Sequence, residues 1–208
     1  MTNSVPSKNL LLIFTRNPEL GKCKTRLAAT VGNENALEIY KFLLHHTVAI
    51  TKDLKVAKQV YYSESICEQD IWNNDIYHKK EQQGSDLGLR MEKAFRDGFK
   101  EGFDKIIIIG SDMYDLSKTD IENAFLQLDE ADFVIGPAED GGYYLLGMKQ
   151  LEAALFIDKK WGTATVLKDT LKNVVHKKTR LLATRNDIDV YEDIKTIPEF
   201  QPYLKKRS

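Results

Sequence analysis

The chain has 208 residues, of which 42% are hydrophobic and 29% charged, proportions that fit a globular protein and exclude a low-complexity or disordered one. Its 30 basic and 31 acidic residues leave a net charge of -1, which excludes the broad basic surface of a nucleic-acid-binding protein. A chain of this length forms one substantial domain, and we expect a single domain over residues 1–208.

The first predicted element is a buried strand at Leu10–Phe14. Five consecutive apolar residues are few for a helix and suit a central parallel strand that is covered on both faces. The run Pro18–Leu27 follows, in which Gly21 marks a turn and a helix is expected to begin near Thr25. The chain therefore passes from a strand through a glycine-containing loop into the start of a helix.

This loop carries three cations, Lys22, Lys24 and Arg26. Unpaired backbone N–H groups at a helix start favour an anion, and the cations add positive charge, so the sequence predicts a site for a di- or triphosphate. The loop lacks the G-x-x-x-x-G-K-[ST] spacing of a P-loop, which argues against a P-loop kinase or ATPase. A solvated basic turn is the alternative, because short charged runs are common on protein surfaces.

Helices and strands then alternate along the chain. Asn33 is placed to cap an amphipathic helix, and a strand follows at Ala57–Tyr62. A second amphipathic helix is expected over residues 87–98. It leads to the four isoleucines of Ile106–Ile109, which predict the most central strand of the sheet.

The second half of the chain continues this alternation. Ser117 and Asp120 form a capping-box pair at the start of a helix that ends near Leu128. The remaining predicted elements are strands at 132–135 and 143–146, a helix at 163–173, a strand at 180–182 and a helical turn at 191–194. The pattern predicts an α/β sandwich with a mainly parallel sheet, whose ligand site lies beyond the carboxyl ends of the strands.

One carboxylate, Asp112, directly follows the central strand. The edge of a sheet holds such a group rigidly and suits a hard divalent cation that bridges to phosphates, so Asp112 is the first predicted metal ligand. A turn or capping role is its alternative. A second carboxylate is expected from Asp187-Ile188-Asp189, with Asp189 as the ligand. The alternative for Asp189 is the N-cap of the helical turn that follows.

Two glycine-containing loops complete the predicted site. The segment Gln82–Met91 places glycines, a carboxylate and an arginine at a helix entrance, where they are expected to shape a nucleotide or sugar pocket. Its alternative is simple capping of the helix by Ser85 or Asp86. The segment Gly136–Tyr144 holds two acids between strands and predicts a carboxylate base near an acceptor hydroxyl, with a plain hairpin turn as the alternative.

Cysteine usage and the N-terminal segment bear on the compartment. The 2 cysteines, Cys23 and Cys67, lack partners at metal-ligand spacing, which favours a reducing setting. Residues 1–9 are polar, and the apolar run after them is far shorter than a signal-peptide core or a membrane span. We therefore expect a cytoplasmic protein that does not associate with membranes; the sequence predicts no oligomeric state.

Taken together, these segments resemble a family of bacterial proteins described as GT-A-type glycosyltransferase-like, formerly a domain of unknown function. The resemblance rests on six patches that occur in one order along nearly the whole chain. They are Phe14–Leu27 with its Pro-x-x-Gly-Lys-x-Lys-Thr-Arg-Leu core, Gln83–Met91, Gly110-Ser111-Asp112, Gly136–Gly147, Trp161, and Asp187-Ile188-Asp189 with Asp193. The chain departs from the family at Tyr114, where a proline is usual.

The resemblance implies the nucleotide-diphospho-sugar transferase fold of GT-A type. This is a three-layer α/β/α sandwich with a Rossmann-like sheet that glycosyltransferases share with nucleotidyltransferases. It also implies that the cations of the first loop bind phosphate and that Asp112 and Asp189 bind Mg²⁺ or Mn²⁺. By the same resemblance Asp140 is an acceptor-activating base and Trp161 is a platform for a sugar, with a buried core position as the alternative for Trp161.

We therefore expect a metal-dependent transferase that binds a nucleoside-diphosphate sugar and moves the sugar to a small acceptor. One alternative is a nucleotidyltransferase that joins an NTP to a phosphorylated small molecule and releases pyrophosphate, and another is a non-catalytic nucleotide- or sugar-phosphate-binding protein. The expected catalytic residues are Arg26 and Asp140, beside the metal ligands Asp112 and Asp189. The expected nucleotide- and sugar-binding residues are Gly21, Lys22, Lys24, Thr25, Arg26, Gln83, Gly84, Asp86, Arg90, Gly141, Gly142, Tyr143 and Trp161.

Overall fold

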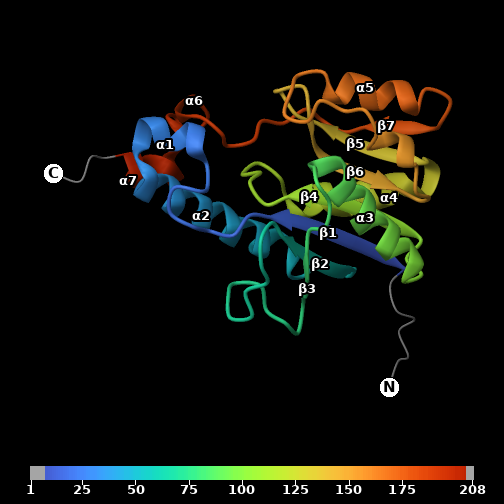
Figure 1. The fold of residues 1–208 in the computed structure, drawn as a ribbon, viewed down its shortest axis with the longest axis horizontal. Coiled ribbons are helices and arrows are strands. Elements are labelled where there is room, and N and C mark those ends of the chain that lie inside the picture. Colours follow the sequence, from blue (N-terminus) through green and yellow to red (C-terminus); the bar gives the residue numbers. More distant parts are fainter. Residues whose placement is uncertain (1–7, 205–208) are drawn as a thin grey trace.

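The computed structural model describes residues 8–204, so residues 1–7 and 205–208 and most of the polar N-terminal segment lie outside the description. Within the described range, a sheet of seven strands lies between two layers of helices (Figure 1). The predicted three-layer α/β/α architecture with a mainly parallel sheet is confirmed.

The strands are β1 (Asn9–Thr15), β2 (Ala57–Tyr62), β3 (His78–Glu81), β4 (Lys105–Gly110), β5 (Phe133–Pro137), β6 (Tyr143–Met148) and β7 (Thr179–Leu181). They are ordered β3-β2-β1-β4-β6-β5-β7, so β4 is central as predicted. Strand β6 runs antiparallel to its neighbours β4 and β5, whereas the other pairings are parallel. Every predicted strand is present, and β3 is an additional polar strand at the edge of the sheet.

The register of β1 and β4 brings two predicted site segments together. Phe14 of β1 pairs with Gly110 of β4, so both strands end at the same level of the sheet. The loop after β1 and the turn at Asp112 therefore start side by side, although 88 residues separate Lys24 from Asp112. This confirms that both segments lie at the carboxyl ends of adjacent parallel strands.

The helices are α1 (Thr25–Val31), α2 (Asn33–Thr51), α3 (Leu87–Lys100), α4 (Lys118–Glu130), α5 (Val166–Asn173), α6 (Tyr191–Ile194) and α7 (Gln201–Leu204), with 3-10 turns η1 (Ala153–Leu155) and η2 (Pro198–Phe200). Apolar side chains of α2 and α4 pack on one face of the sheet, and those of α3, η1 and α5 pack on the other. Within residues 8–204, no helix combines the length and apolarity that a membrane crossing requires.

The helix starts differ in part from the prediction. The capping box between Ser117 and Asp120 is confirmed. Asn33 is not a cap: Gly32, with a φ of 84°, precedes α2 and Asn33 is its first helical residue. Helix α5 begins at Val166 and not at Thr163, because residues 163–165 form the turn that leads into it.

A third cluster of apolar side chains lies beyond the carboxyl end of β1, where α1, α6 and α7 group together at the left of Figure 1. Leu27 of α1, Ile194 of α6 and Phe200 of η2 are fully buried in it. Tyr114 packs against this cluster with ring centroids 5.1 Å from Phe200 and 6.0 Å from Phe42. Its ring therefore gives the Asp112 turn an aromatic anchor.

Candidate functional site

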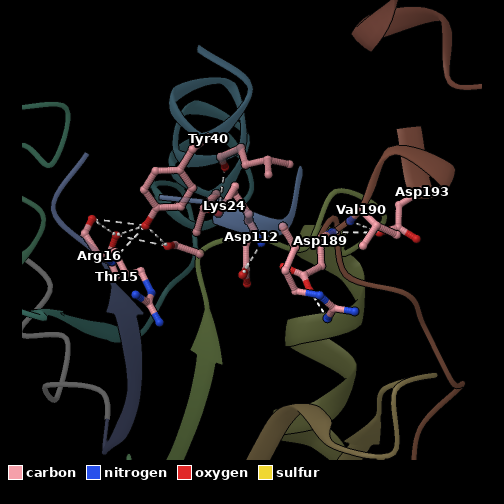
Figure 2. A network of polar contacts seen from close by, with 12 residues as sticks. Thr15, Arg16, Lys24, Tyr40, Asp112, Asp189, Val190 and Asp193 are labelled. Atoms are coloured by element: carbon pink, nitrogen blue, oxygen red, sulfur yellow. Dashed lines mark hydrogen bonds and ion pairs between the residues drawn. The ribbon is translucent and has the colours of Figure 1, made fainter. Parts of the chain in front are cut away.

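Buried hydroxyl groups of Thr15, Tyr40 and Ser111 join the carboxyl ends of β1 and β4 (Figure 2). The Tyr40 oxygen lies 3.2 Å from Thr15 Oγ1 and 3.2 Å from Ser111 Oγ. The backbone N–H of Arg16 donates to the same Tyr40 oxygen over 2.9 Å. Because a buried polar group is costly unless it is hydrogen-bonded, these contacts fix the residues that follow both strands.

Lys24 makes the central contact of the site (Figure 2). Its Nζ lies 2.8 Å from Asp112 Oδ2, and only 7% of its side chain is exposed. Burial alone would lower the Lys24 pKa, but the charge of Asp112 raises it above its usual value. In the same way burial opposes ionisation of Asp112, yet Lys24 holds the pKa of that carboxyl below its usual range. Both groups are therefore charged at neutral pH.

The backbone is shaped for this contact. Lys24 has a φ of 47°, in the left-handed region, and immediately precedes α1. At the other end of the contact, a Cβ atom on Gly110 would come within 2.8 Å of Asp112 Oδ1. Glycine at this strand end therefore leaves room for the carboxylate to lie over the sheet edge.

Arg26 and Asp189 form a second pair between the same two regions (Figure 2). Arg26 Nη1 lies 2.5 Å from Asp189 Oδ2, with 73% of the arginine side chain exposed. Asp189 is not the N-cap of α6, because the Asp193 carboxylate accepts the backbone N–H groups of Asp189 and Val190 at 2.8 and 2.7 Å. The Asp189 side chain is thereby left to face the loop after β1.

The other two cations near this loop differ in their partners. Lys22 is exposed and pairs with Glu19 at 2.7 Å and Glu64 at 3.6 Å. The Arg16 guanidinium makes no hydrogen bond or ion pair within residues 8–204. Its backbone is nevertheless fixed by Tyr40. Arg16 is a cation of the site that the sequence analysis missed, because it lies just before the glycine-containing loop that drew attention.

These side chains line a cleft of about 720 Å³, which we name the basic compartment. Its cations are Arg16, Lys22, Lys24, Arg26 and Arg90, and its other lining residues are Phe14, Thr15, Thr25, Tyr40, Ser63, Glu64, Gln82, Leu87, Gly110, Ser111, Asp112, Asp187 and Asp189. A volume of this size lies within the roughly 300–1,000 Å³ that small-molecule sites occupy. The predicted loop cations and both predicted metal ligands therefore share one cleft.

A second, smaller cavity of about 260 Å³ adjoins it, which we name the apolar compartment. Its lining residues are Phe14, Leu87, Met91, Ile108, Ile109, Gly110, Asp112, Met113, Ala138, Asp140, Gly142, Tyr143, Tyr144, Trp161, Gly162, Thr163, Val166 and Asp187. Asp112 and Asp187 line both compartments, as do Phe14, Leu87 and Gly110. The two compartments thus meet at the carboxylates that follow β4 and β7.

Asp187 occupies this junction, although the sequence analysis preferred its neighbour Asp189 as the metal ligand. Burial and the nearby charges of Asp112 and Asp140 raise the pKa of Asp187 to about 6. No ion pair of Asp187 occurs within residues 8–204. Asp187 and Asp189 stand on either side of Ile188, which is buried. The sequence alone does not distinguish these two equivalent positions, and the contacts in the structure do.

Arg185 anchors the segment Asp187-Ile188-Asp189, which we name the acidic segment, to the rest of the site. Its guanidinium lies 2.8 Å from Asp120 Oδ2 and 3.4 Å from Asp115 Oδ2. Its backbone N–H donates to Pro137 O over 3.1 Å, which ties this segment to the end of β5. Arg185 thereby fixes the approach of the chain to Asp187 from two sides.

The segment between β5 and β6 is a hairpin turn, which was the alternative given for it from the sequence. Its Asp140 nevertheless lines the apolar compartment. Asp140 Oδ1 accepts the backbone N–H of Gly142 over 2.8 Å, which fixes the carboxylate. Gly141 has a φ of 87°, and a Cβ atom there would come within 2.6 Å of Ala164 Cα. Gly141 therefore supports the turn by close packing and does not line the compartment itself.

The segment before α3 contributes mainly support. Asp86 caps α3 by accepting the Leu89 backbone N–H at 2.9 Å, so capping explains this carboxylate. Arg90 Nε donates to Gly84 O over 3.0 Å and fixes the turn, while Arg90 also lines the basic compartment. Gln82 lines that compartment and Gln83 does not, because successive residues of an extended chain point to opposite sides.

Trp161 and Tyr143 form an aromatic wall of the apolar compartment. Their rings meet edge to face, with centroids 6.4 Å apart. Trp161 also packs against Gly88 at the start of α3, where a Cβ atom would come within 2.7 Å of the indole. Trp161 is partly buried and lines the cavity, so it is not the fully buried core residue that its alternative supposed.

The structure thus brings most of the predicted site residues into one place. Lys22, Lys24, Thr25, Arg26, Arg90, Asp112 and Asp189 line the basic compartment, and Asp140, Gly142, Tyr143 and Trp161 line the apolar compartment. Five predicted binding residues line neither compartment: Gly21, Gln83, Gly84, Asp86 and Gly141. Four of these five shape turns or a helix start, as their backbone and capping contacts show, and Gln83 points away.

The acidic groups at the junction fit a divalent cation. Within residues 8–204, no group of three His, Cys, Asp or Glu side chains is placed to hold a metal ion by itself. Mg²⁺, however, commonly takes one or two carboxylates and completes its shell with phosphate oxygens and water. The Lys24 ammonium lies against Asp112 as a bound cation would. The oxygen-only donors Asp112 and Asp187 therefore match a hard ion that arrives with a phosphate ligand.

Sequence comparison places the chain in a family. A family model described as "Uncharacterized protein conserved in bacteria (DUF2064)" matches residues 44–163, which is more than half of the chain. The chain belongs to this family. The matched segment includes Asp112, Asp140 and Trp161, and the first loop and the acidic segment lie on either side of it. No curated protein shows a significant match to the sequence.

Solved structures share the fold. A crystal structure from Desulfovibrio desulfuricans G20, described as a "putative nucleotide-diphospho-sugar transferase", has a TM-score of 0.82 and 30% identity over 88% of this chain and 83% of its own. A cytidylyltransferase from Leptospira borgpetersenii serovar Hardjo-bovis (strain JB197) has a TM-score of 0.56 and 15% identity, over 90% of this chain and 83% of its own. The structure of a CMP:2-keto-3-deoxy-manno-octonic acid synthetase complexed with CTP has a TM-score of 0.58 and 11% identity, over 91% of this chain and 96% of its own. The last two establish the fold alone, and together the comparisons confirm the predicted superfamily.

Proposed function

We propose that this protein is a metal-dependent transferase that binds a nucleoside-diphosphate sugar and moves the sugar to a small acceptor. The observation that carries the proposal is the double pairing of Lys24 with Asp112 and of Arg26 with Asp189 at one sheet edge. A diphosphate with its divalent cation is complementary in charge to both halves of these pairs. The likeness to the 30% identical D. desulfuricans structure supports this substrate class.

The diphosphate is assigned to the basic compartment. Lys24 and Arg26 contribute positive charge to its lining, and the Arg16 guanidinium, which makes no hydrogen bond or ion pair within residues 8–204, is available to a phosphate oxygen without breaking an existing contact. Charge-assisted hydrogen bonds of this kind are the strong ones in phosphate recognition. Arg16 therefore joins Lys22, Lys24 and Arg26 among the proposed phosphate ligands.

Asp112 would hold Mg²⁺ or Mn²⁺ together with the acidic segment. Asp187 is the better placed of its two carboxylates, because it lines both compartments beside Asp112, whereas Asp189 lines only the basic compartment. When bound, such an ion offsets the negative charge of the diphosphate leaving group.

In the proposed reaction, an acceptor hydroxyl oxygen forms a bond to the anomeric carbon of the sugar. The bond from that carbon to the diphosphate oxygen breaks, and its electron pair leaves with the nucleoside diphosphate. The hydroxyl proton passes to the carboxylate of Asp140, whose Oδ1 is held by Gly142 and which lines the apolar compartment. Lys24 and Arg26 stabilise the charge that develops on the leaving group.

Nucleotidyl transfer is the second candidate, since the fold is shared with a cytidylyltransferase and a CMP-sugar synthetase. There a phosphate oxygen of the second substrate would bond to the α-phosphorus of an NTP, and pyrophosphate would leave with the electrons of the broken P–O bond. The five cations of the basic compartment suit a triphosphate as well as a diphosphate. The released product therefore distinguishes the two candidates.

A thermal-shift panel of NTPs and nucleoside-diphosphate sugars, each with and without Mn²⁺, tests the proposal. Ligand at a hundredfold excess over its dissociation constant stabilises by about 2.7 kcal/mol, which raises the melting temperature by roughly 5–10 °C for a chain of this size. Metal-dependent shifts with nucleoside-diphosphate sugars, and release of the nucleoside diphosphate on turnover, are expected.

Other results would contradict it. Shifts confined to one NTP, with release of pyrophosphate, would establish nucleotidyl transfer instead. Binding without turnover across a broad acceptor set would favour the non-catalytic alternative, and no shift with any nucleotide would exclude both transferase candidates. A shift that persists without change in Asp112→Asn/Asp187→Asn would show that these carboxylates do not hold the metal ion.

A further inference from the structure

The walls of the apolar compartment have little hydrogen-bonding capacity left for a ligand. The Tyr143 hydroxyl points to Met91 Sδ at 3.9 Å, and the Tyr144 hydroxyl donates to Ala183 O at 3.1 Å. The hydroxyl of Thr163 donates to Lys160 O at 2.7 Å. The hydroxyl groups of the walls are therefore used within the protein, and what they present to a ligand is mainly hydrocarbon and aromatic surface.

The polar side chains that remain are all acidic. Three carboxylates, those of Asp112, Asp140 and Asp187, line the cavity. Its lining residues all belong to the described part of the chain, and none of them is Lys, Arg or His. In the basic compartment, by contrast, five of the lining residues are cations. The sign of the local charge thus reverses from one compartment to the other.

This reversal has a consequence for the second substrate. A phosphate group in the apolar compartment would lose water and lie beside Asp140 with no cation of the cavity lining to pair with. Lys24, which neutralises Asp112, lines only the basic compartment, and the ion proposed at Asp112 and Asp187 is already shared with the diphosphate. A hydroxyl or an amine on an apolar body would instead donate to a carboxylate while its body contacts Met91, Trp161 and Val166. The cavity therefore selects against a sugar phosphate.

The compartment is also limited in size by rigid contacts. Trp161 packs on Gly88, and the Leu167 backbone N–H donates to Gly141 O over 2.9 Å, which ties α5 to the β5–β6 turn. At about 260 Å³ the cavity is slightly smaller than the roughly 300 Å³ at which sites for larger small molecules begin. A single ring or a short aliphatic chain matches this volume.

We propose that the apolar compartment binds the acceptor, and that this acceptor is an uncharged or cationic alcohol or amine with a small apolar body and no phosphate group. That this ligand acts as the acceptor rests on the proposed transferase function, whereas its chemistry follows from the lining of the compartment alone. It favours glycosyl transfer over the nucleotidyl alternative stated above, in which the second substrate is a phosphorylated small molecule.

The test uses three probes that differ only in their polar group: benzyl alcohol, benzylamine and benzyl phosphate. The chain has 2 tryptophans, and Trp72 is 2% exposed and packs on Tyr77, so Trp72→Phe leaves Trp161 as the sole indole reporter of this cavity. Titrations of full-length Trp72→Phe are followed by Trp161 fluorescence. Inorganic pyrophosphate in excess is included to keep benzyl phosphate from the basic compartment.

Benzyl alcohol and benzylamine are expected to bind at least about tenfold more tightly than benzyl phosphate, since like charges placed together are penalised. A matched pair of variants at an exposed lining position strengthens the test. Thr163→Lys adds a cation and is expected to bring benzyl phosphate to the affinity of benzyl alcohol. Thr163→Gln, of similar length and without charge, is expected to leave the discrimination unchanged.

Equal binding of benzyl phosphate and benzyl alcohol, or no binding of any probe, would overturn the inference. An equal effect of Thr163→Lys and Thr163→Gln on benzyl phosphate would overturn the charge argument. The nucleotide panel is read separately by melting temperature. Probe binding without any nucleotide shift would therefore refute the transferase proposal, whereas nucleotide shifts without probe binding would refute only the acceptor chemistry.

Discussion

The basic and apolar compartments share Asp112 and Asp187 but differ in how their side chains are satisfied. In the basic compartment Lys22, Lys24 and Arg26 each contact a carboxylate of the protein. In the apolar compartment, the hydroxyl groups are bonded inward and the aromatic rings contact each other. A ligand that binds Lys22, Lys24 or Arg26 must exchange existing ion pairs, whereas a ligand of the apolar compartment contacts mainly hydrocarbon and aromatic surface without such competition.

The two compartments therefore differ in what maintains their shape. In the basic compartment the same ion pairs stabilise the fold and open to bind the ligand, so a substitution there is expected to change both the stability of the protein and its affinity for the ligand. In the apolar compartment the shape comes from close packing at Gly88 and Gly141. The relative size of the effects on stability and on ligand binding should therefore differ between substitutions in the two compartments.

The largest expected effect on stability follows from Lys24→Met, which leaves the Asp112 carboxylate without its cation. Removal of one partner from a fully buried pair costs about 3–5 kcal/mol, and we expect about 3 kcal/mol because Asp112 is 36% exposed. The melting temperature should fall by roughly 6–12 °C. Thermal unfolding of both proteins at pH 7 measures the change.

The control is the double variant Lys24→Met/Asp112→Asn, which removes the stranded charge along with its partner. It is expected to regain a large part of the loss, since an uncharged amide is less costly to leave without a cation. A double variant that is no more stable than Lys24→Met would show that the pair does not couple the loop after β1 to the turn after β4.

The next effect is expected for Tyr40→Phe, which deletes the hydroxyl that Thr15, Ser111 and the Arg16 backbone share. Buried donors left without an acceptor cost about 1–3 kcal/mol, and we expect about 2 kcal/mol. Urea unfolding measures it. The matched control is Tyr61→Phe, which also removes a buried hydroxyl but only a single bond, to Gln59 at 3.1 Å. Equal losses in both variants would refute a special role for the Tyr40 hydroxyl.

The sequence predicted the fold well where a single pattern decided the structure. The isoleucines of β4 and the apolar run of β1 are long enough to indicate buried strands without tertiary information. Strand β3, with the sequence His-Lys-Lys-Glu, has no apolar run and exists because β2 offers it an edge. The antiparallel insertion of β6 between β4 and β5 likewise depends on pairing partners that no local pattern specifies.

The candidate site was predictable as a set of loops but not as a set of contacts. Parallel strand ends meet at one edge, so the motifs at Lys24 and Asp112 were expected to lie near each other. Which carboxylate each cation contacts depends on backbone details such as the left-handed Lys24, which sequence periodicity does not reveal. The same reason explains why Asp189 was preferred to Asp187 and why Gln83 was chosen over Gln82.

A smaller effect is expected from Gly88→Ala in the apolar compartment. The added methyl group would meet Trp161 at 2.7 Å and Phe156 O at 2.6 Å, and such overpacking costs typically 1–3 kcal/mol. Higher helix propensity of alanine offsets roughly 0.5–1 kcal/mol of this, so we expect a net loss of about 1 kcal/mol by urea unfolding.

The same variant separates the two compartments. A displaced Trp161 should weaken benzyl alcohol binding by at least about tenfold, while the melting-temperature shifts by nucleotides stay as in the unchanged protein. In a Trp161→Ala background, Gly88→Ala is expected to cost less stability than in the unchanged protein, because the indole is one of the two groups that the methyl meets. Loss of nucleotide shifts in Gly88→Ala would mean that the compartments are not independent.

The smallest stability change is expected for Arg26→Gln, although this residue belongs to the same loop as Lys24. Arg26 is 73% exposed, and exposed ion pairs contribute about 0–1 kcal/mol, so the free energy of unfolding in urea should change by less than about 1 kcal/mol.

Nucleotide binding should respond more strongly to Arg26→Gln than stability does, because a phosphate that loses a charge-assisted hydrogen bond loses about 1.5–3 kcal/mol, or roughly tenfold or more in affinity. The matched control is Arg96→Gln, which breaks an exposed pair with Glu92 on α3 that lines neither compartment. If both variants bind nucleotides equally well, Arg26 is part of a surface ion pair and the basic compartment does not use it.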